Sequence, residues 1–221
     1  MTRILIADDH PLFRLALTQA VREIVADAQV FEADSLDAAR AQLAVQPDTD
    51  LVLLDLHMPG SHGLMGLAAL RGEHPSVAVV MISAHDEAQT IRRALEFGAA
   101  GFIAKRSDMG ELKRALAAVL ACEDYVPPDL REAVEQARPA IDDDRLAAKL
   151  ATLTPQQFRV LALVAEGRLN KQIADALAIQ ERTVKAHVSA IFEKLGVRNR
   201  TQAGVLLRTL ELADPARAPV P

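Results

Sequence analysis

The stretch LVLLDLHMPGSHG, from Leu51 to Gly63, is the segment that decides the fold of this chain. A short apolar run leads to Asp55, and Met-Pro-Gly then stops it, which is typical of a buried strand followed by a turn. Open α/β sheets bind their ligands at the carboxyl ends of the strands. The pattern therefore places Asp55 where chemistry would take place.

Similar apolar runs occur on both sides of this stretch and alternate with helical patterns. The predicted strands are RILIAD, VFEA, DLVLLD, VAVVMIS and AGFIAK, near Arg3, Val30, Asp50, Val77 and Gly101. The predicted helices begin near Pro11, Ser35, Leu64, Glu87 and Asp108, with Ser35 and Asp108 as N-caps. This alternation indicates an α/β domain with a five-stranded parallel sheet and helices on both faces.

The rest of the chain has a different pattern. From Glu123 onward, prolines and the triple aspartate at 142–144 indicate a linker with some helix near 130–137. After Thr154-Pro155 all apolar spacing is helical, with helices predicted at 155–166, 171–177, 181–195 and 200–210. We therefore predict an α/β domain over 1–122, a linker over 123–151, an all-α domain over 152–212 and a tail over 213–221.

Composition narrows the functional class. The 221 residues carry a net charge of −5, but residues 152–221 hold 10 Lys and Arg against 6 Asp and Glu, a net charge of +4 that leaves −9 for the rest. The acidic charge of the first part suggests a cation site, and the basic charge of residues 152–221 suggests binding to nucleic acid. No apolar stretch approaches the roughly 18 residues of a membrane span, and MTRILIADDH is unlike a secretory signal. We therefore expect a cytoplasmic protein. Its single cysteine, Cys122, cannot form an internal disulfide, which fits this expectation.

Polar residues follow four of the five predicted strands. Asp8 and Asp9 follow the first, Asp55 ends the third, Ser83 ends the fourth and Lys105 follows the fifth. Crowded carboxylates need a cation, and their oxygens suit Mg²⁺, while a lysine and a hydroxyl can bind phosphate oxygens. Taken singly, each residue is explained as a turn former, a helix cap or a surface residue. Together they predict that Asp55 is a phosphoryl acceptor.

The predicted helix 181–195 has two different faces. Val184, Val188, Ile191, Phe192 and Leu195 lie on the apolar face, and Arg182, Lys185, Ala186, Ser189 and Glu193 lie on the other. Cations beside small residues suit entry into a DNA major groove. A helical bundle with ordinary solvated charges explains the same spacing and stays open at this point.

The motifs IADDH, LLDLHMPG, MISAH and GFIAK, within residues 2–122, resemble the receiver domain of bacterial two-component response regulators. This resemblance implies a flavodoxin-like fold in which a sensor histidine kinase phosphorylates Asp55. It also implies that Asp8, Asp9, Asp55 and the backbone carbonyl of His57 hold Mg²⁺, and that Ser83 and Phe102 form the switch pair. Arg106 follows Lys105 where many receivers have proline.

Residues 153–207 are similar to the LuxR-type helix-turn-helix of the NarL/FixJ subfamily, through LTPQQFRVLALVAEG, NKQIADAL, RTVKAHVSAIFEKLGV and RNRTQA. Gln180 stands where Ser or Thr usually caps the recognition helix. By resemblance Lys185, Ala186 and Ser189 face the groove, and the expected further DNA contacts are Lys171, Arg182, Thr183 and Arg200. The last helix, with Val205, Leu206 and Leu207, would pair two copies on an inverted repeat.

We therefore predict a transcription regulator, not an enzyme, that forms a homodimer on promoter DNA when phosphorylated. The expected mechanism is that the unphosphorylated receiver masks the recognition helix. Three alternatives stay open: DNA binding that is independent of phosphorylation, a protein-binding output, and a phosphohydrolase. The phosphohydrolase is disfavoured because His57 stands where such enzymes present a second aspartate.

Overall fold

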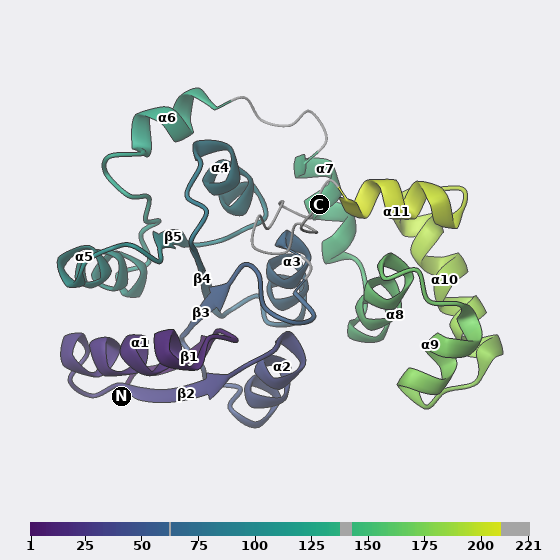
Figure 1. The fold of residues 1–221 in the computed structure, drawn as a ribbon, viewed down its shortest axis with the longest axis horizontal. Helices are drawn as coiled ribbons and strands as arrows, with labels where there is room; N and C mark the ends of the chain where they lie inside the picture. The colour runs from purple at the N-terminus through teal and green to yellow at the C-terminus, as the bar shows by residue number, and fades with distance from the viewer. Residues whose placement is uncertain (62, 138–142, 209–221) are drawn as a thin grey trace, which may run out of the picture.

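A five-stranded parallel sheet forms the centre of the first domain in this computed structural model, which describes residues 1–61, 63–137 and 143–208 (Figure 1). The strands are β1 (Arg3–Ala7), β2 (Gln29–Ala33), β3 (Leu51–Asp55), β4 (Ala78–Ser83) and β5 (Gly101–Ala104). Their order across the sheet is β2-β1-β3-β4-β5. The predicted sheet is confirmed, and its order reverses next to β1, where doubly wound folds bind ligands.

Two apolar cores cover the two faces of the sheet, because alternate strand residues point in opposite directions. On one face Ile4 and Ile6 pack with residues of α1 (Pro11–Ile24) and α5 (Met109–Leu120). On the other, Leu5 and Leu54 pack with α2 (Leu36–Val45), α3 (Leu64–Glu73) and α4 (Ala88–Glu96). The central strand β3 is buried along its whole length, so Asp55 ends a strand that has no solvent-facing side.

Local sequence signals explain where several of these helices begin. The Ser35 and Asp108 side chains accept backbone N–H bonds from Ala38 and Glu111, so both predicted N-caps are confirmed. Pro11 occupies the first turn of α1, where its missing N–H costs nothing.

The linker is tied to the first domain near its start. Tyr125 forms a parallel bridge with Gly101 of β5, and α6 (Arg131–Gln136) packs against α4, as Figure 1 shows. The helix predicted near 130–137 is thus present. A further helix, α7 (Asp143–Ala151), begins within the aspartate run, where we predicted only linker.

The second domain is all-α, as predicted, with helices α8 (Pro155–Ala165), α9 (Asn170–Leu177), α10 (Glu181–Leu195) and α11 (Arg200–Arg208). Thr154 and Gln157 form a capping box at the start of α8. Gln180 makes no side-chain cap at α10, as the sequence indicated. The end of the predicted last helix and the tail 213–221 lie outside the described residues.

Helix α7 joins the two domains. It contacts α3 and α4 of the first domain and α10 of the second, and its residues Leu146 and Leu150 are buried. The Lys149 ammonium donates to the Leu195 carbonyl at 2.8 Å, at the C-terminus of α10. The domains therefore pack through α3, α4, α7 and α8, and α9 and α10 lie on the far side of α8 from the sheet (Figure 1).

Candidate functional site

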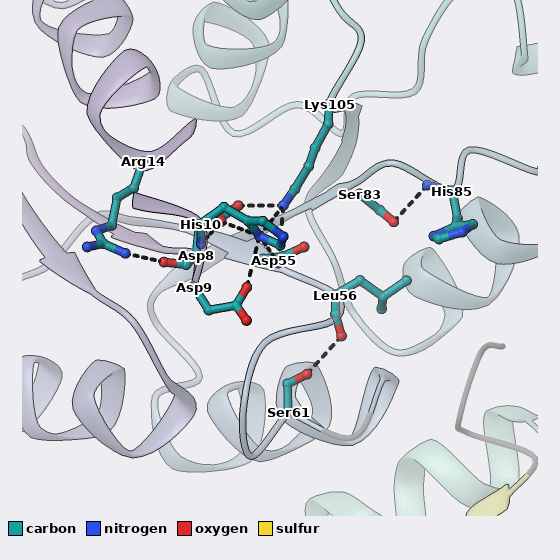
Figure 2. A network of polar contacts seen from close by, with 10 residues as sticks. All are labelled: Asp8, Asp9, His10, Arg14, Asp55, Leu56, Ser61, Ser83, His85 and Lys105. Atoms are coloured by element: carbon teal, nitrogen blue, oxygen red, sulfur yellow. Dashed lines mark hydrogen bonds and ion pairs between the residues drawn. The ribbon is translucent and has the colours of Figure 1, made fainter. Parts of the chain in front are cut away.

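Three carboxylates and one ammonium meet at the carboxyl edge of the sheet, as Figure 2 shows. Asp8 follows β1, Asp55 ends β3 and Lys105 follows β5, so the parallel register brings them to one edge. Lys105 Nζ lies 2.7 Å from Asp8 Oδ2 and 3.2 Å from Asp55 Oδ2. The structure thus brings together the acidic residues and the lysine that the strand ends predicted.

Burial controls the electrostatics of this cluster. Asp8 and Asp55 are only 1% and 2% exposed, whereas the Asp9 side chain is 23% exposed. Burial raises the pKa of the Asp55 carboxyl above its ordinary value. The Lys105 ammonium acts to lower this pKa, and the neighbouring Asp8 carboxylate raises it further. The cluster therefore carries more negative charge than its one ammonium compensates, which favours the binding of a cation.

The donor set fits a divalent cation. Asp8, Asp9, His10 and Asp55 each offer one atom, and these atoms lie within 4.8 Å of one another. Carboxylate oxygens are the ligands that Mg²⁺ prefers, and it commonly keeps several waters beside them. The three carboxylates predicted to hold Mg²⁺ are thus close enough to share one ion.

The loop after β3 is fixed by its own hydrogen bonds. The Ser61 hydroxyl, which is buried, donates to the Leu56 carbonyl at 2.8 Å, and the His57 backbone N–H bonds to the Asp55 carboxylate. Gly66 allows the next helix to approach, because a Cβ there would lie 2.9 Å from Ser61 Cβ. This tight turn keeps the His57 backbone beside Asp55.

The predicted switch pair lies on two neighbouring strands, with Ser83 at the end of β4 and Phe102 inside β5. Ser83 is fully buried, and its Oγ accepts the His85 N–H at 3.0 Å. Phe102 is also fully buried, so its ring already occupies the inward setting that the resemblance connects with phosphorylation. Its backbone N–H donates to Tyr125, which ties the switch position to the linker.

The residue that replaces proline after Lys105 does not displace the lysine. Arg106 Nε donates to Asp86 at 2.7 Å, and the Arg106 side chain is 64% exposed. The arginine therefore points into a surface ion pair while Lys105 reaches the carboxylates.

Sequence reasoning missed two side chains at this site. The His10 ring faces the carboxylates, and Arg14 donates to the Asp8 carbonyl while pairing with Glu32. The signal for His10 was its place directly after Asp8 and Asp9 in IADDH. Arg14 gave no such signal, because its role depends on the contact between α1 and β2.

The expected DNA-facing side of α10 is exposed. Val184, Ile191 and Leu195 are buried in the core, whereas Arg182, Lys185, Ala186 and Ser189 face solvent. Lys171 is also exposed and Thr183 is half-buried. The helical spacing therefore predicted both faces of α10 correctly.

The receiver-like domain does not cover the outer side chains of α10 in this structure, and masking by the unphosphorylated receiver stays a prediction. The first domain packs on α7 and α8 through α3 and α4, and this contact leaves the four outer side chains of α10 exposed. Masking could not be judged from sequence, because it depends on which surfaces of two separate domains fit each other.

One expectation for the last helix needs correction, and another gains a structural role. Leu207 is 1% exposed and belongs to the core, so it is not available to a second copy, whereas Val205 is 62% exposed. The Arg200 guanidinium donates to the carbonyls of Val164 and Arg168, at the end of α8. Arg200 thus has a structural role inside the domain, in addition to any contact with DNA.

No helix among residues 1–61, 63–137 and 143–208 is long and apolar enough to cross a membrane.

Two family models match this chain. Residues 4–117 match the response regulator receiver domain, and residues 151–207 match the bacterial regulatory proteins of the luxR family. The glycerol metabolism activator of Pseudomonas putida is 43% identical over 206 residues, which cover 92% of this chain and 93% of that protein. The nitrate/nitrite response regulator protein NarL of Escherichia coli strain K12 is 33% identical over 206 residues, covering 91% and 93%.

Solved structures are similar across both domains. The RcsB response regulator of Salmonella typhimurium has a TM-score of 0.57 at 23% identity, covering 94% of this chain and 100% of that one. An RcsB–DNA complex has a TM-score of 0.56 at 23% identity, covering 95% and 98%. At these identities the likeness establishes the fold, and the two family models establish the kind of domains.

Proposed function

The chain belongs to the two-component response regulators that regulate transcription through a LuxR-type DNA-binding domain, and we propose that phosphorylation of Asp55 controls it. A sensor histidine kinase donates the phosphoryl group, and the modified protein dimerises on an inverted repeat in promoter DNA. The observation that carries this proposal is the position of the Lys105 ammonium, whose Nζ lies 2.7 Å from Asp8 Oδ2 and 3.2 Å from Asp55 Oδ2. A regulator of this kind acts in the cytoplasm, where promoter DNA is found.

The chemistry follows from the position of the Asp55 carboxylate. One of its oxygens attacks the phosphorus of the kinase phosphohistidine, so that an O–P bond forms, the N–P bond breaks and the imidazole leaves. Lys105 would neutralise a phosphoryl oxygen, since its ammonium lies 3.2 Å from Asp55 Oδ2. Mg²⁺, held by Asp8, Asp9, Asp55 and the His57 carbonyl, would supply positive charge beside the transferring group.

Ser83 and Phe102 are the proposed readout of this reaction. The Ser83 hydroxyl would turn from the His85 N–H toward a phosphoryl oxygen, and the inward Phe102 ring would be stabilised. Ser83 ends β4, and Phe102 lies in the neighbouring strand β5, which contacts α4. Helix α4 in turn contacts α7, and α7 contacts α10. These packed helices give a continuous route from Asp55 to the recognition helix.

The DNA contacts follow from the exposed side of α10. Lys185, Ala186 and Ser189 would enter the major groove, with Arg182, Thr183 and Lys171 at the phosphates. Arg200 would act mainly by holding the end of α8, because its guanidinium already donates to two carbonyls there.

A second candidate has one specific observation in its favour. The DNA-facing residues Lys185, Ala186 and Ser189 are exposed, and the domain that carries Asp55 packs through α3 and α4 against α7 and α8 without covering them. The protein could therefore bind DNA whether or not Asp55 is phosphorylated, with phosphorylation affecting only dimerisation or nothing at all.

The deciding experiment compares DNA binding by the wild type and by Asp55→Ala, each with and without Mg²⁺ and acetyl phosphate as a small phosphoryl donor. Retained genomic fragments are sequenced, and incorporation is followed by intact mass. We expect one added phosphoryl group and tighter binding in the wild type alone. Equal, sequence-specific binding in all samples would favour the second candidate, and phosphorylation of Asp55→Ala would exclude Asp55 as the acceptor.

A further inference from the structure

The His10 side chain lies inside the acidic cluster. Its Nδ1 is 3.1 Å from Asp8 Oδ1, 2.9 Å from Asp9 Oδ1 and 3.9 Å from Asp55 Oδ2. Figure 2 shows the ring directed toward these carboxylates, beside the Lys105 ammonium. No other imidazole among the described residues offers an atom to the cluster.

We propose that His10 Nδ1 is a ligand of the divalent cation at this site, so that the receiver domain prefers Mn²⁺ over Mg²⁺. This inference rests on the proposed function, because it refines the cation site of the phosphoacceptor. It adds a nitrogen donor from the side chain of His10 to the oxygen donors that the sequence predicted.

The spacing of the donors fits one ion. Adjacent ligands of an octahedral cation with bonds of about 2.1 Å lie about 3.0 Å apart. The separations of His10 Nδ1 from the Asp8 and Asp9 oxygens are 3.1 and 2.9 Å, which match such neighbouring positions. All four donor atoms fall within 4.8 Å of one another, so the ring and the carboxylates can contact the same ion.

The position of His10 in the chain leaves its ring free for this role. His10 is the N-cap residue of α1, but its side chain forms no capping hydrogen bond. The backbone is held instead, because the His10 N–H donates to Asp8 Oδ1 at 2.7 Å and its carbonyl accepts the Arg14 N–H at 2.9 Å. A fixed backbone with a side chain that is 65% exposed allows the ring to adjust to an ion without disturbing the core.

The chemistry of the donors gives the preference. Carboxylate, carbonyl and water oxygens suit both Mg²⁺ and Mn²⁺, but Mn²⁺ is a first-row transition ion that also accepts an imidazole nitrogen, which Mg²⁺ does not favour. A different arrangement is that the ring only substitutes for a cation between Asp8 and Asp9 and is displaced when an ion binds. In that case removal of the ring would strengthen the binding of both ions.

Calorimetric titration of the full-length protein with MnCl₂ and with MgCl₂ tests the proposal, using wild type, His10→Ala and His85→Ala. His85 is the matched control, since its ring lies near the site but offers no atom to the cluster. We expect His10→Ala to weaken Mn²⁺ binding about tenfold and Mg²⁺ binding less than about twofold. Electron spin echo modulation at bound Mn²⁺ should show an imidazole ¹⁴N coupling in wild type and His85→Ala and none in His10→Ala.

Each other outcome has a definite meaning. Equal losses for both ions, a gain for both, or a ¹⁴N signal that persists in His10→Ala would overturn the assignment of His10 while leaving the phosphoacceptor site intact. A wild type that binds neither ion would instead overturn the cation site itself, and with it the proposed chemistry at Asp55. His10→Asn, which keeps a polar side chain, should behave as His10→Ala in the ¹⁴N measurement.

Discussion

The phosphoacceptor pocket and the outer side of α10 both depend on charged side chains, yet the protein holds them in opposite ways. The pocket collects Asp8, Asp55 and Lys105 from three separate strand ends and buries the two aspartates to 1% and 2% exposure. The outer side of α10 takes Arg182 and Lys185 from consecutive turns of one helix and leaves them in solvent. The phosphoacceptor pocket thus depends on tertiary structure, which brings distant residues together. The charged side of α10 depends only on the periodicity of one helix.

This difference sets how each region responds to its surroundings. Charges in the buried pocket interact strongly, because little water or salt screens them. Charges on α10 are screened by salt and contribute little to folding. Substitutions in the pocket should therefore change chemistry and stability together, whereas those on α10 should change DNA affinity alone.

The largest effect is expected in the pocket. Lys105→Ala should slow phosphorylation of Asp55 by acetyl phosphate about 100-fold to 1,000-fold, because no other ammonium among the described residues contacts this carboxylate. Intact mass against time measures the rate. The control is Arg106→Ala, which removes an exposed cation next to it in sequence and should leave the rate within about twofold. Equal losses in both variants would show that general positive charge, not contact, accounts for the rate.

The junction between the two regions should give the next largest effect. Leu150 is fully buried in α7, where this helix joins α3 to α10, so Leu150→Ala should lower the free energy of unfolding by about 2–5 kcal/mol. Urea unfolding followed by circular dichroism measures it. Val45→Ala is the matched surface control, as Val45 is 72% exposed. A similar loss in both variants would mean that α7 is not packed between the domains.

A smaller effect is expected on α10. Lys185→Ala should weaken specific DNA binding by about 1–3 kcal/mol without lowering the melting temperature, because its ion pair with Glu181 is exposed. Fluorescence anisotropy with a labelled target fragment measures the affinity. Lys113→Ala removes an exposed lysine of α5 and should leave affinity unchanged. Unchanged affinity in Lys185→Ala would remove α10 from the DNA interface.

The smallest effect tests the charge imbalance of the pocket. Burial raises the Asp55 pKa in the folded protein, so the ionised carboxylate opposes folding at neutral pH. Asp55→Asn should therefore raise the free energy of unfolding by about 1 kcal/mol at pH 7 without added divalent ions, with Lys105 still paired to Asp8. The gain should vanish as pH falls through the raised pKa, because Asp55 is then protonated in the wild type too. Thermal unfolding across pH measures it, and a loss of stability at pH 7 would contradict the expected sign.

Much of the fold was predictable from the sequence, for local reasons. Apolar runs of strand length and apolar spacing of helical period identified the sheet and most of the helices. The caps Ser35, Asp108 and Thr154 act on backbone groups within three residues, so their roles depend on no distant contact. Asp8, Asp55 and Lys105 were also predictable, because parallel strands bring their carboxyl ends to one edge.

The remaining features were decided by tertiary structure. The start of α7, the internal role of Arg200 and the burial of Leu207 arise from contacts between segments tens of residues apart. The ring of His10 comes within 3.9 Å of the Asp55 carboxylate only because β1 and β3 are neighbours in the sheet. Sequence patterns determined which residues form each element and each face. The docking of the domains, and with it the exposure of α10, depends on the fit of surfaces that no local pattern encodes.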